Sequence, residues 1–149
     1  MKAVRTLVLV AGDEDARFLI NEGTGKGLHE LAVLNIRQFA DAQAEFADRP
    51  GRAGIGKGGK AMQSFDPHET VDEMHRLRFA THVIEALDQE WNAAKPDRLI
   101  VAAPPKMLGA LRDKLRGPAA AALHADLPKD LVSVEVRDLA RHFEKIAAF

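Results

Sequence analysis

Two short, almost uninterrupted apolar runs constrain the fold of this chain most. One spans Val4–Val10, and the other, Asp97–Ala103, carries LIVAA after a charged pair. Short apolar runs without a helical period are typical of strands that are buried on both faces of a sheet. Such strands need a covering layer on each side, so the two runs favour an α/β domain.

Turn residues and periodicity predict the other elements. Clusters of glycine or acidic residues separate strand-like segments, and apolar residues at every third or fourth position indicate helices. The further predicted strands are Ala16–Asn21 and His29–Leu34. The first predicted helix has Asp66 as its cap, begins at Pro67 and ends before Pro96. The second runs from Pro105 to about Leu115, and the third has Ser133 as its cap and continues through Ile146. The apolar stripe of the long helix is expected to comprise Leu77, Ala80, Ile84, Leu87 and Trp91, widened by Phe79 and Val83.

Three segments stay open to alternatives. Residues 35–47 are ambiguous, and residues 121–127 fit either a fifth strand or a short alanine-rich helix. Leu131–Val136 alternates like a strand, but the helical period there continues to Ile146, which favours a helix. The resulting order predicts one domain over residues 1–149, with a mixed five-stranded sheet and helices on both faces.

Composition narrows the class of protein. The apolar fraction of 46% and the charged fraction of 29% are ordinary for a globular protein. The absence of cysteine excludes disulfides, cysteine-ligated zinc and cysteine nucleophiles. A net charge of −1 requires any nucleic-acid contact to be local. The N-terminal apolar run is too short for a signal peptide, and no run reaches the about 20 apolar residues of a membrane span, so we expect a cytoplasmic protein without a membrane partner.

The segment over residues 48–65 is rich in glycine and predicts a flexible basic loop. Its cations are Arg49, Arg52, Lys57 and Lys60, and no acid lies between Asp48 and Asp66. A solvated connector accounts for the composition alone. RNA contact accounts for the charge as well, because cations neutralise phosphates and glycines permit close backbone approach. Phe65 is the only aromatic residue in it, so we expect contact with the RNA backbone rather than sequence-specific stacking.

Two catalytic interpretations of the same segment fit less well. Gly54-x-x-x-x-Gly59-Lys60 matches part of a phosphate-binding loop, but Ala61 replaces the hydroxyl residue that would ligate magnesium, and no strand leads into the loop. Gln63 and Ser64 have no activating base adjacent in sequence, so a nucleophile is not supported. We therefore assign no catalytic residue.

Three further groups of residues are candidates for a metal or ligand site. His68, His75 and His82 recur every seven residues on the long helix, too far apart to share a metal, and are expected to form a solvated or partner-facing stripe. The acids at 13–15 are consecutive, so they do not converge as a two-metal site would require, and a solvated turn is expected. Residues 104–106 follow a strand, where ligands often bind, but a rigid helix start is the favoured interpretation.

One stretch resembles the middle domain of archaeal and eukaryotic class-1 release factors. Gly58-Gly59 and Arg78-Phe79-Ala80 match a Gly-Gly-Gln loop and an Arg-Phe-Ala element on the long helix that follows it. The resemblance implies a ribonuclease-H-like mixed sheet and a loop that enters the ribosomal peptidyl-transferase centre. Lys60 stands where the glutamine would be, and Gln63 lies three residues later, so the hydrolytic residue does not carry over.

A second resemblance covers nearly the whole chain. The matching pieces are LVLVAGDEDARFL, GKGLHEL, DRPGR, FDPHE, RFA, LIVAAPPKMLGALR and PKDL, spread over residues 7–131. In this order and spacing they are similar to the bacterial proteins required for attachment to host cells, which look like a bacterial branch of the release-factor-like domain.

These observations lead to three hypotheses. The first is a non-catalytic or weakly catalytic factor associated with the ribosome or tRNA; peptidyl-tRNA ester hydrolysis is its one candidate activity. The second is a protein-interaction or regulatory module, indirectly required for attachment, with no RNA role; the third is a nuclease or esterase. The residues predicted to contact RNA are Arg49, Arg52, Lys57, Gly58, Gly59, Lys60 and Gln63. No metal and no small-molecule cofactor is expected.

Overall fold

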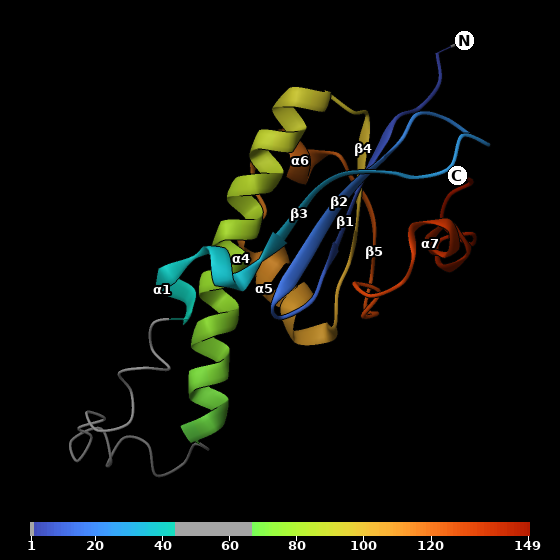
Figure 1. Ribbon diagram of the computed structural model, residues 1–149. Coiled ribbons are helices and arrows are strands. Elements are labelled where there is room, and N and C mark those ends of the chain that lie inside the picture. Colours follow the sequence, from blue (N-terminus) through green and yellow to red (C-terminus); the bar gives the residue numbers. More distant parts are fainter. Residues whose placement is uncertain (1, 44–66) are drawn as a thin grey trace.

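The computed structural model describes residues 2–43 and 67–149 (Figure 1). The strands are β1 (Thr6–Ala11), β2 (Asp15–Asn21), β3 (His29–Asn35), β4 (Arg98–Ala102) and β5 (Leu123–Leu127). The helices are the 3-10 helix η1 (Ile36–Gln38), α1 (Ala40–Gln43), α4 (Pro67–Ala94), α5 (Pro105–Lys114), α6 (Gly117–Ala121) and α7 (Val136–His142).

The strands form one mixed five-stranded sheet in the order β3-β2-β1-β4-β5. β1 pairs antiparallel with β2 and parallel with β4, so Leu9 lies between Phe18 and Val101. β2 pairs antiparallel with β3, and β4 pairs parallel with β5. The hairpin order of the first strands and the helical crossovers before the last ones produce this mixture, as the sequence predicted.

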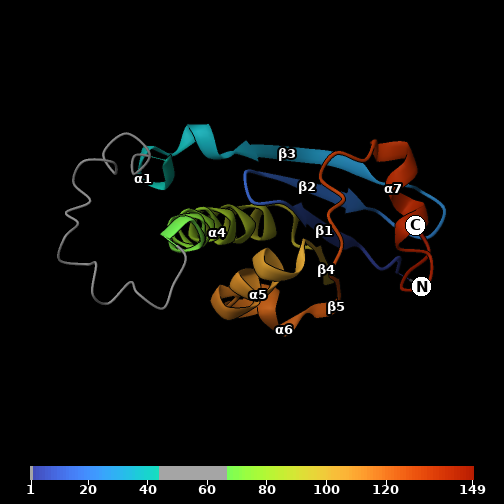
Figure 2. The ribbon, with the colours of Figure 1, turned by 90° about the horizontal axis from the view of Figure 1, so that it is seen from below.

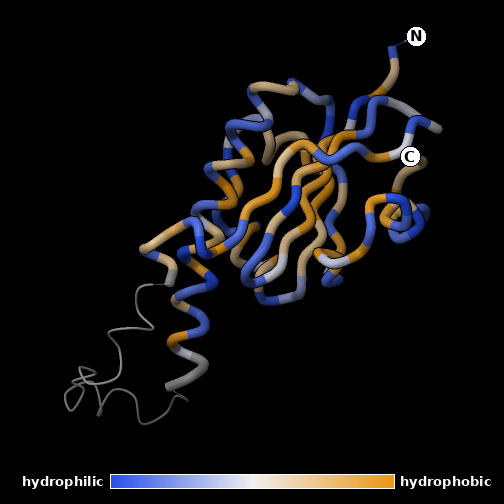
Figure 3. Tube along the Cα trace, viewed as in Figure 1, coloured by the Kyte–Doolittle hydropathy of each residue, from blue (hydrophilic) through white to orange (hydrophobic). Residues whose placement is uncertain are grey.

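Helices cover both faces of the sheet, which makes three layers (Figure 2). Leu7, Leu9 and Phe18 face a core shared with α4, α5 and α6. Val8 and Val10 point the other way, into a second core closed by Leu139 and Phe143 of the α7 segment. Because alternate residues of β1 enter opposite cores, its sequence is apolar from Leu7 to Ala11, and Figure 3 shows the hydrophobic colouring concentrated along the strands. The α/β class, the mixed five-stranded sheet and the three-layer arrangement expected from the sequence are confirmed.

Several predicted boundaries shift. Val4 is 49% exposed, and the first strand begins at Thr6. The last helix begins at Val136 with Glu135 as its N-cap, not Ser133. Arg17 of β2 donates hydrogen bonds to the carbonyls of Val132 and Val134 and so fixes a turn before that helix. The strand alternative for residues 121–127 is confirmed, since β5 covers Leu123–Leu127 and only Ala121 belongs to α6.

The predicted buried stripe of α4 is confirmed except at Leu77. Phe79, Ala80, Val83, Ile84 and Leu87 are buried, but Leu77 is 39% exposed. The reason is that α5 packs against one side of α4 while the sheet takes the adjacent side, so the buried face centres on Phe79 and Val83. Leu77 is left at the open side of the α4/α5 contact, beside a cavity that is described below.

Arg5 closes the C-terminal end of α4. This helix has no basic residue in its last turn, and Lys95 after it adopts a left-handed conformation with φ 48°. The Arg5 guanidinium donates to the carbonyls of Ala94 and Lys95, and it also pairs with Glu22 at 2.6 Å. A cation from the start of the chain thus binds the carbonyls that a helix C-terminus leaves unpaired.

We expect Glu22→Gln to change how stability depends on pH. The hydrogen bond from the Arg5 guanidinium lowers the pKa of Glu22, so the carboxylate stabilises the fold above its unfolded-state pKa of about 4.3 and loses this effect as the pH falls through the lower, folded-state value. The variant should therefore be less stable than the parent above about pH 4.5, with the difference shrinking in more acidic solution. Urea unfolding between pH 3 and 6 measures this.

Glu144→Gln is the matched control, because Glu144 is exposed and lies on the opposite side of the sheet. Its stability at pH 6 should stay within about 0.5 kcal/mol of the parent. A Glu22→Gln difference that stays constant from pH 6 to pH 3 would show that the ion pair with Arg5 does not contribute to folding.

Candidate functional site

Two neighbouring cavities lie at the carboxyl ends of the parallel strands β1 and β4. Asp13 and Glu14, which follow β1, line one of them, and Pro105 and Lys106, which follow β4, line the other. Arg76 of α4 lines both. In open α/β sheets, ligands commonly bind beyond the carboxyl ends of the strands, where the connections diverge. This edge of the sheet is therefore the candidate functional site among the described residues.

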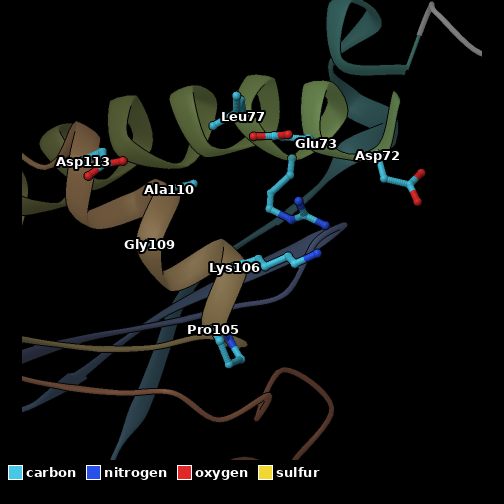
Figure 4. Close-up of a pocket in the computed structure, with 9 residues that line it drawn as sticks. Asp72, Glu73, Leu77, Pro105, Lys106, Gly109, Ala110 and Asp113 are labelled. Carbon is cyan, nitrogen blue, oxygen red and sulfur yellow. The ribbon is translucent and has the colours of Figure 1, made fainter. Parts of the chain in front are cut away.

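The larger cavity, of about 430 Å³, lies between α4 and α5 and is called the α4/α5 cleft. Its lining residues are Asp72, Glu73, Arg76, Leu77, Pro105, Lys106, Gly109, Ala110 and Asp113. Figure 4 shows Lys106 and Asp113 toward opposite ends of α5, with Gly109 and Ala110 between them, and Glu73 on the facing helix. The cleft thus combines charged groups of both signs with a small apolar wall.

The smaller cavity, of about 330 Å³, lies on the β1 side of Arg76. Its lining residues are Asp13, Glu14, Ile36, Arg37, Asp72, His75 and Arg76. The Arg76 guanidinium binds the Asp13 carboxylate through contacts of 3.2 and 3.3 Å. This ion pair ties α4 to the turn after β1 and stands between the two cavities.

Comparison with known protein families gives one assignment. The family described as "Protein required for attachment to host cells" matches residues 7–143. The chain belongs to this family. The match begins in β1 and ends one residue after α7, so it includes the elements that form both cavities. Comparison with curated proteins gives no match. In the described part of this host attachment family protein, no helix is both long and apolar enough to cross a membrane.

The histidines of α4 do not form the predicted solvated stripe. His75 is only 6% exposed, at the wall of the smaller cavity. His82 stacks on Phe39 with ring centroids 4.0 Å apart and pairs with Asp41 at 2.7 Å. The prediction was wrong for both because α1 and η1 fold over this side of α4. The side chain of His68 lies outside the described residues, and within them no cluster of histidine and acidic groups suits a metal ion.

The acidic turn after β1 is exposed, as predicted, but two of its carboxylates bind the fold. Asp13 pairs with Arg76, and Asp15 accepts a hydrogen bond of 2.6 Å from the Asn35 side chain at the end of β3. The carboxylates therefore serve to join α4 and β3 to the turn. They do not converge on a common point as a two-metal site requires.

The predicted RNA-contacting residues all lie outside the described part of this family member. They are Arg49, Arg52, Lys57, Gly58, Gly59, Lys60 and Gln63. The described residues on either side of them are Gln43, which ends α1, and Pro67, which begins α4. RNA contact by these residues stays a prediction.

The element that matches the release-factor pattern has a structural role in this chain. Phe79 and Ala80 are fully buried in the core under α4. Arg78 donates a hydrogen bond of 3.1 Å to the Asp41 carbonyl and so helps His82 to hold α1 against α4. The need for packing and for anchoring α1 explains these residue types without reference to a ligand.

Sequence reasoning pointed to one side of the cleft and missed the other. Lys106 was singled out because it follows a strand, although a rigid helix start was favoured there. Asp72, Arg76 and Asp113 were not assigned to a site, because their helical period is that of an ordinary solvated face. Only the packing angle of α4 against α5 places the three residues around one cavity.

Proposed function

We propose that this host attachment family protein is a cytoplasmic factor that associates with the ribosome or tRNA and contacts RNA through residues 48–65. The observation that carries the proposal is the charge of this segment. Residues 49–65 contain four cations and no acid, whereas the complete chain has a net charge of −1, so the rest of the chain carries −5. A polyanion is attracted to the segment and repelled by the net negative charge of the rest of the chain.

The way in which the flanking helices are held supports the same proposal. His82 and Arg78 of α4 both bind Asp41, two residues before the end of α1. Pro67, where α4 begins, lies 11 residues before Arg78, which corresponds to about 16 Å of helix. The basic segment therefore lies in the chain between α1 and α4, two helices that are bound to each other through Asp41.

Peptidyl-tRNA hydrolysis is not part of the proposal. Lys60 offers a cation where the release-factor pattern has a neutral amide, and Gln63 lies three residues beyond that position. A cation retains affinity for phosphate but lacks the amide that would position water on an ester. We expect RNA association without efficient ester cleavage.

The test is salt-dependent co-sedimentation with ribosomes. Replacing Arg52, Lys57 and Lys60 by serine should weaken association about tenfold or more, because each phosphate contact contributes about 0.7–0.9 to the slope of log affinity against log salt. The slope should fall by about 2 for the triple variant. The assay needs several salt concentrations, since a single one does not separate charge contacts from other binding.

The matched control removes the same charge from another surface. Arg137, Arg141 and Lys145 are exposed cations on and after α7, on the far side of the sheet. Their replacement by serine should leave association unchanged. Equal loss in both triple variants would indicate a nonspecific effect of net charge. Association that neither variant weakens would contradict the proposal and favour the protein-interaction module.

A further inference from the structure

The α4/α5 cleft carries opposite charges on facing walls. Lys106 supplies an ammonium group from the first turn of α5, while Glu73 on α4 and Asp113 at the far end of α5 supply carboxylates. None of these three side chains forms an ion pair with another described residue. Many other charges of the described surface are paired, for example Asp88 with Arg116 and Asp126 with Arg112. The cleft is thus a place where charges of both signs are available to a ligand.

The wall between these charges is apolar and has room for a ligand chain. Leu77 and Ala110 line it, and a methyl group built at Gly109 would meet no atom within 4 Å. Glycine costs a helix about 1 kcal/mol relative to alanine, and here it leaves the middle of the cleft open. Methylene groups of a ligand can lie against this part of α5.

The spacing along α5 defines the length of the ligand. Lys106 and Asp113 are seven residues apart, or about 10.5 Å along the helix axis. Glu73 faces α5 from the opposite wall, and in Figure 4 it lies toward the Lys106 end, with Leu77 between it and Asp113. Asp72 lines the cleft at the end where α4 begins. A fitting ligand carries an anionic group at one end, a cationic group at the other and an aliphatic chain between them.

We propose that the α4/α5 cleft binds a basic amino acid, arginine or lysine, either free or as the C-terminal residue of a peptide. The α-carboxylate pairs with Lys106 and with Arg76, and the α-amino group or the N–H of the peptide chain lies toward Asp72 and Glu73. The aliphatic part of the side chain packs on Gly109, Ala110 and Leu77. The guanidinium or ammonium group at its end binds Asp113. This inference is independent of the RNA contact.

Several features of the cleft favour this class over simpler ions. An inorganic anion would use Lys106 and Arg76 but would leave the carboxylates Glu73 and Asp113 facing it. A simple amine would use the carboxylates but would leave Lys106 without an anion. A cavity of about 430 Å³ lies within the usual size of small-molecule sites, which is about 300–1,000 Å³.

The experiment titrates the full chain with L-arginine and follows the amide signals of Lys106 and Gly109 by NMR. We expect saturable shifts. Agmatine lacks the carboxylate and citrulline lacks the positive charge, so each should bind about tenfold more weakly or worse. The peptide Ala-Ala-Arg tests the second source, and tighter binding of the peptide than of L-arginine would assign the site to a peptide end. If neither ligand gives saturable shifts, the proposal is overturned.

Three variants locate the binding. Gly109→Met fills the cleft and should abolish the shifts while the helix stays at least as stable, because methionine is a far better helix former than glycine. Lys106→Met and the pair Glu73→Gln with Asp113→Asn should each raise the dissociation constant of L-arginine about tenfold or more. Glu144→Gln with Lys145→Met, exposed and on the other side of the sheet, is the control and should change nothing. Arginine binding that survives Gly109→Met would place the ligand elsewhere and refute the assignment.

Discussion

Phe79→Ala should destabilise the fold by about 3–5 kcal/mol, the range for removing a buried phenylalanine ring. Phe79 is fully buried on α4, in the core that α4 shares with β1 and β2, and the Phe39 ring lies 6.3 Å from it. The lost ring leaves a cavity at the place where α4, the sheet and the segment before α1 meet. Native domains are stable by only about 5–15 kcal/mol, so the variant should be close to unfolding at 37 °C.

Urea denaturation followed by circular dichroism measures this effect. With a slope of about 1–3 kcal/mol per molar urea, the midpoint should fall by roughly 2 M. Leu77→Ala is the control, since it removes a side chain of similar size two residues away that is largely outside the core. Its cost should stay below about 1 kcal/mol. Similar costs for the two variants would contradict the burial of Phe79 and the exposure of Leu77 on α4.

Asn21→Ala should cost about 2–3 kcal/mol, although it removes only a small polar side chain. Asn21 ends β2 and is 1% exposed. Its amide group donates to the carbonyls of Gly27 at 2.7 Å and Phe149 at 3.2 Å, and its oxygen accepts from the Gly23 amide at 3.1 Å. The substitution leaves these backbone groups without their partner in a place that water does not reach.

The effect should be local as well as global. Amide hydrogen exchange should accelerate over residues 23–27, because the turn loses the side chain that binds both of its ends. Asn21→Asp should cost at least as much at neutral pH, since a carboxylate would face two carbonyl oxygens. Asn92→Ala on the exposed side of α4 is the control and should stay within about 0.5 kcal/mol of the parent. If Asn21→Ala leaves the stability unchanged, the turn is held by backbone contacts alone.

The sheet could be predicted because each strand is recognised from the pattern of a few neighbouring residues. The uninterrupted apolar letters of β1 and β4 require cover on both faces, and glycine and acidic turns separate β1, β2 and β3. The last helix was placed by its period, but its start was wrong by a few residues. Arg17, more than 100 positions away, binds the carbonyls of Val132 and Val134, and no local signal reports such a contact.

The candidate site was much less predictable than the fold. Its charged side chains come from α4 and α5, and each looks like part of a solvated helix face when its own helix is considered alone. The prediction for the histidines was wrong for the same reason. The spacing of His75 and His82 along α4 suggests exposure, but η1 and α1 cover them. Pocket walls depend on how helices cross, and this is not encoded in the periodicity of either helix.

The sequence by itself determined the order of strands and helices, the mixed sheet, the absence of cysteine chemistry and the concentration of cations in residues 49–65. These properties follow from composition and from patterns within a few neighbouring residues. Only the tertiary structure decided where the buried face of α4 ends, which acids are paired, and that Lys106, Glu73 and Asp113 line one cavity. These depend on the packing of elements far apart in the chain, where the shape of one side chain sets the position of another.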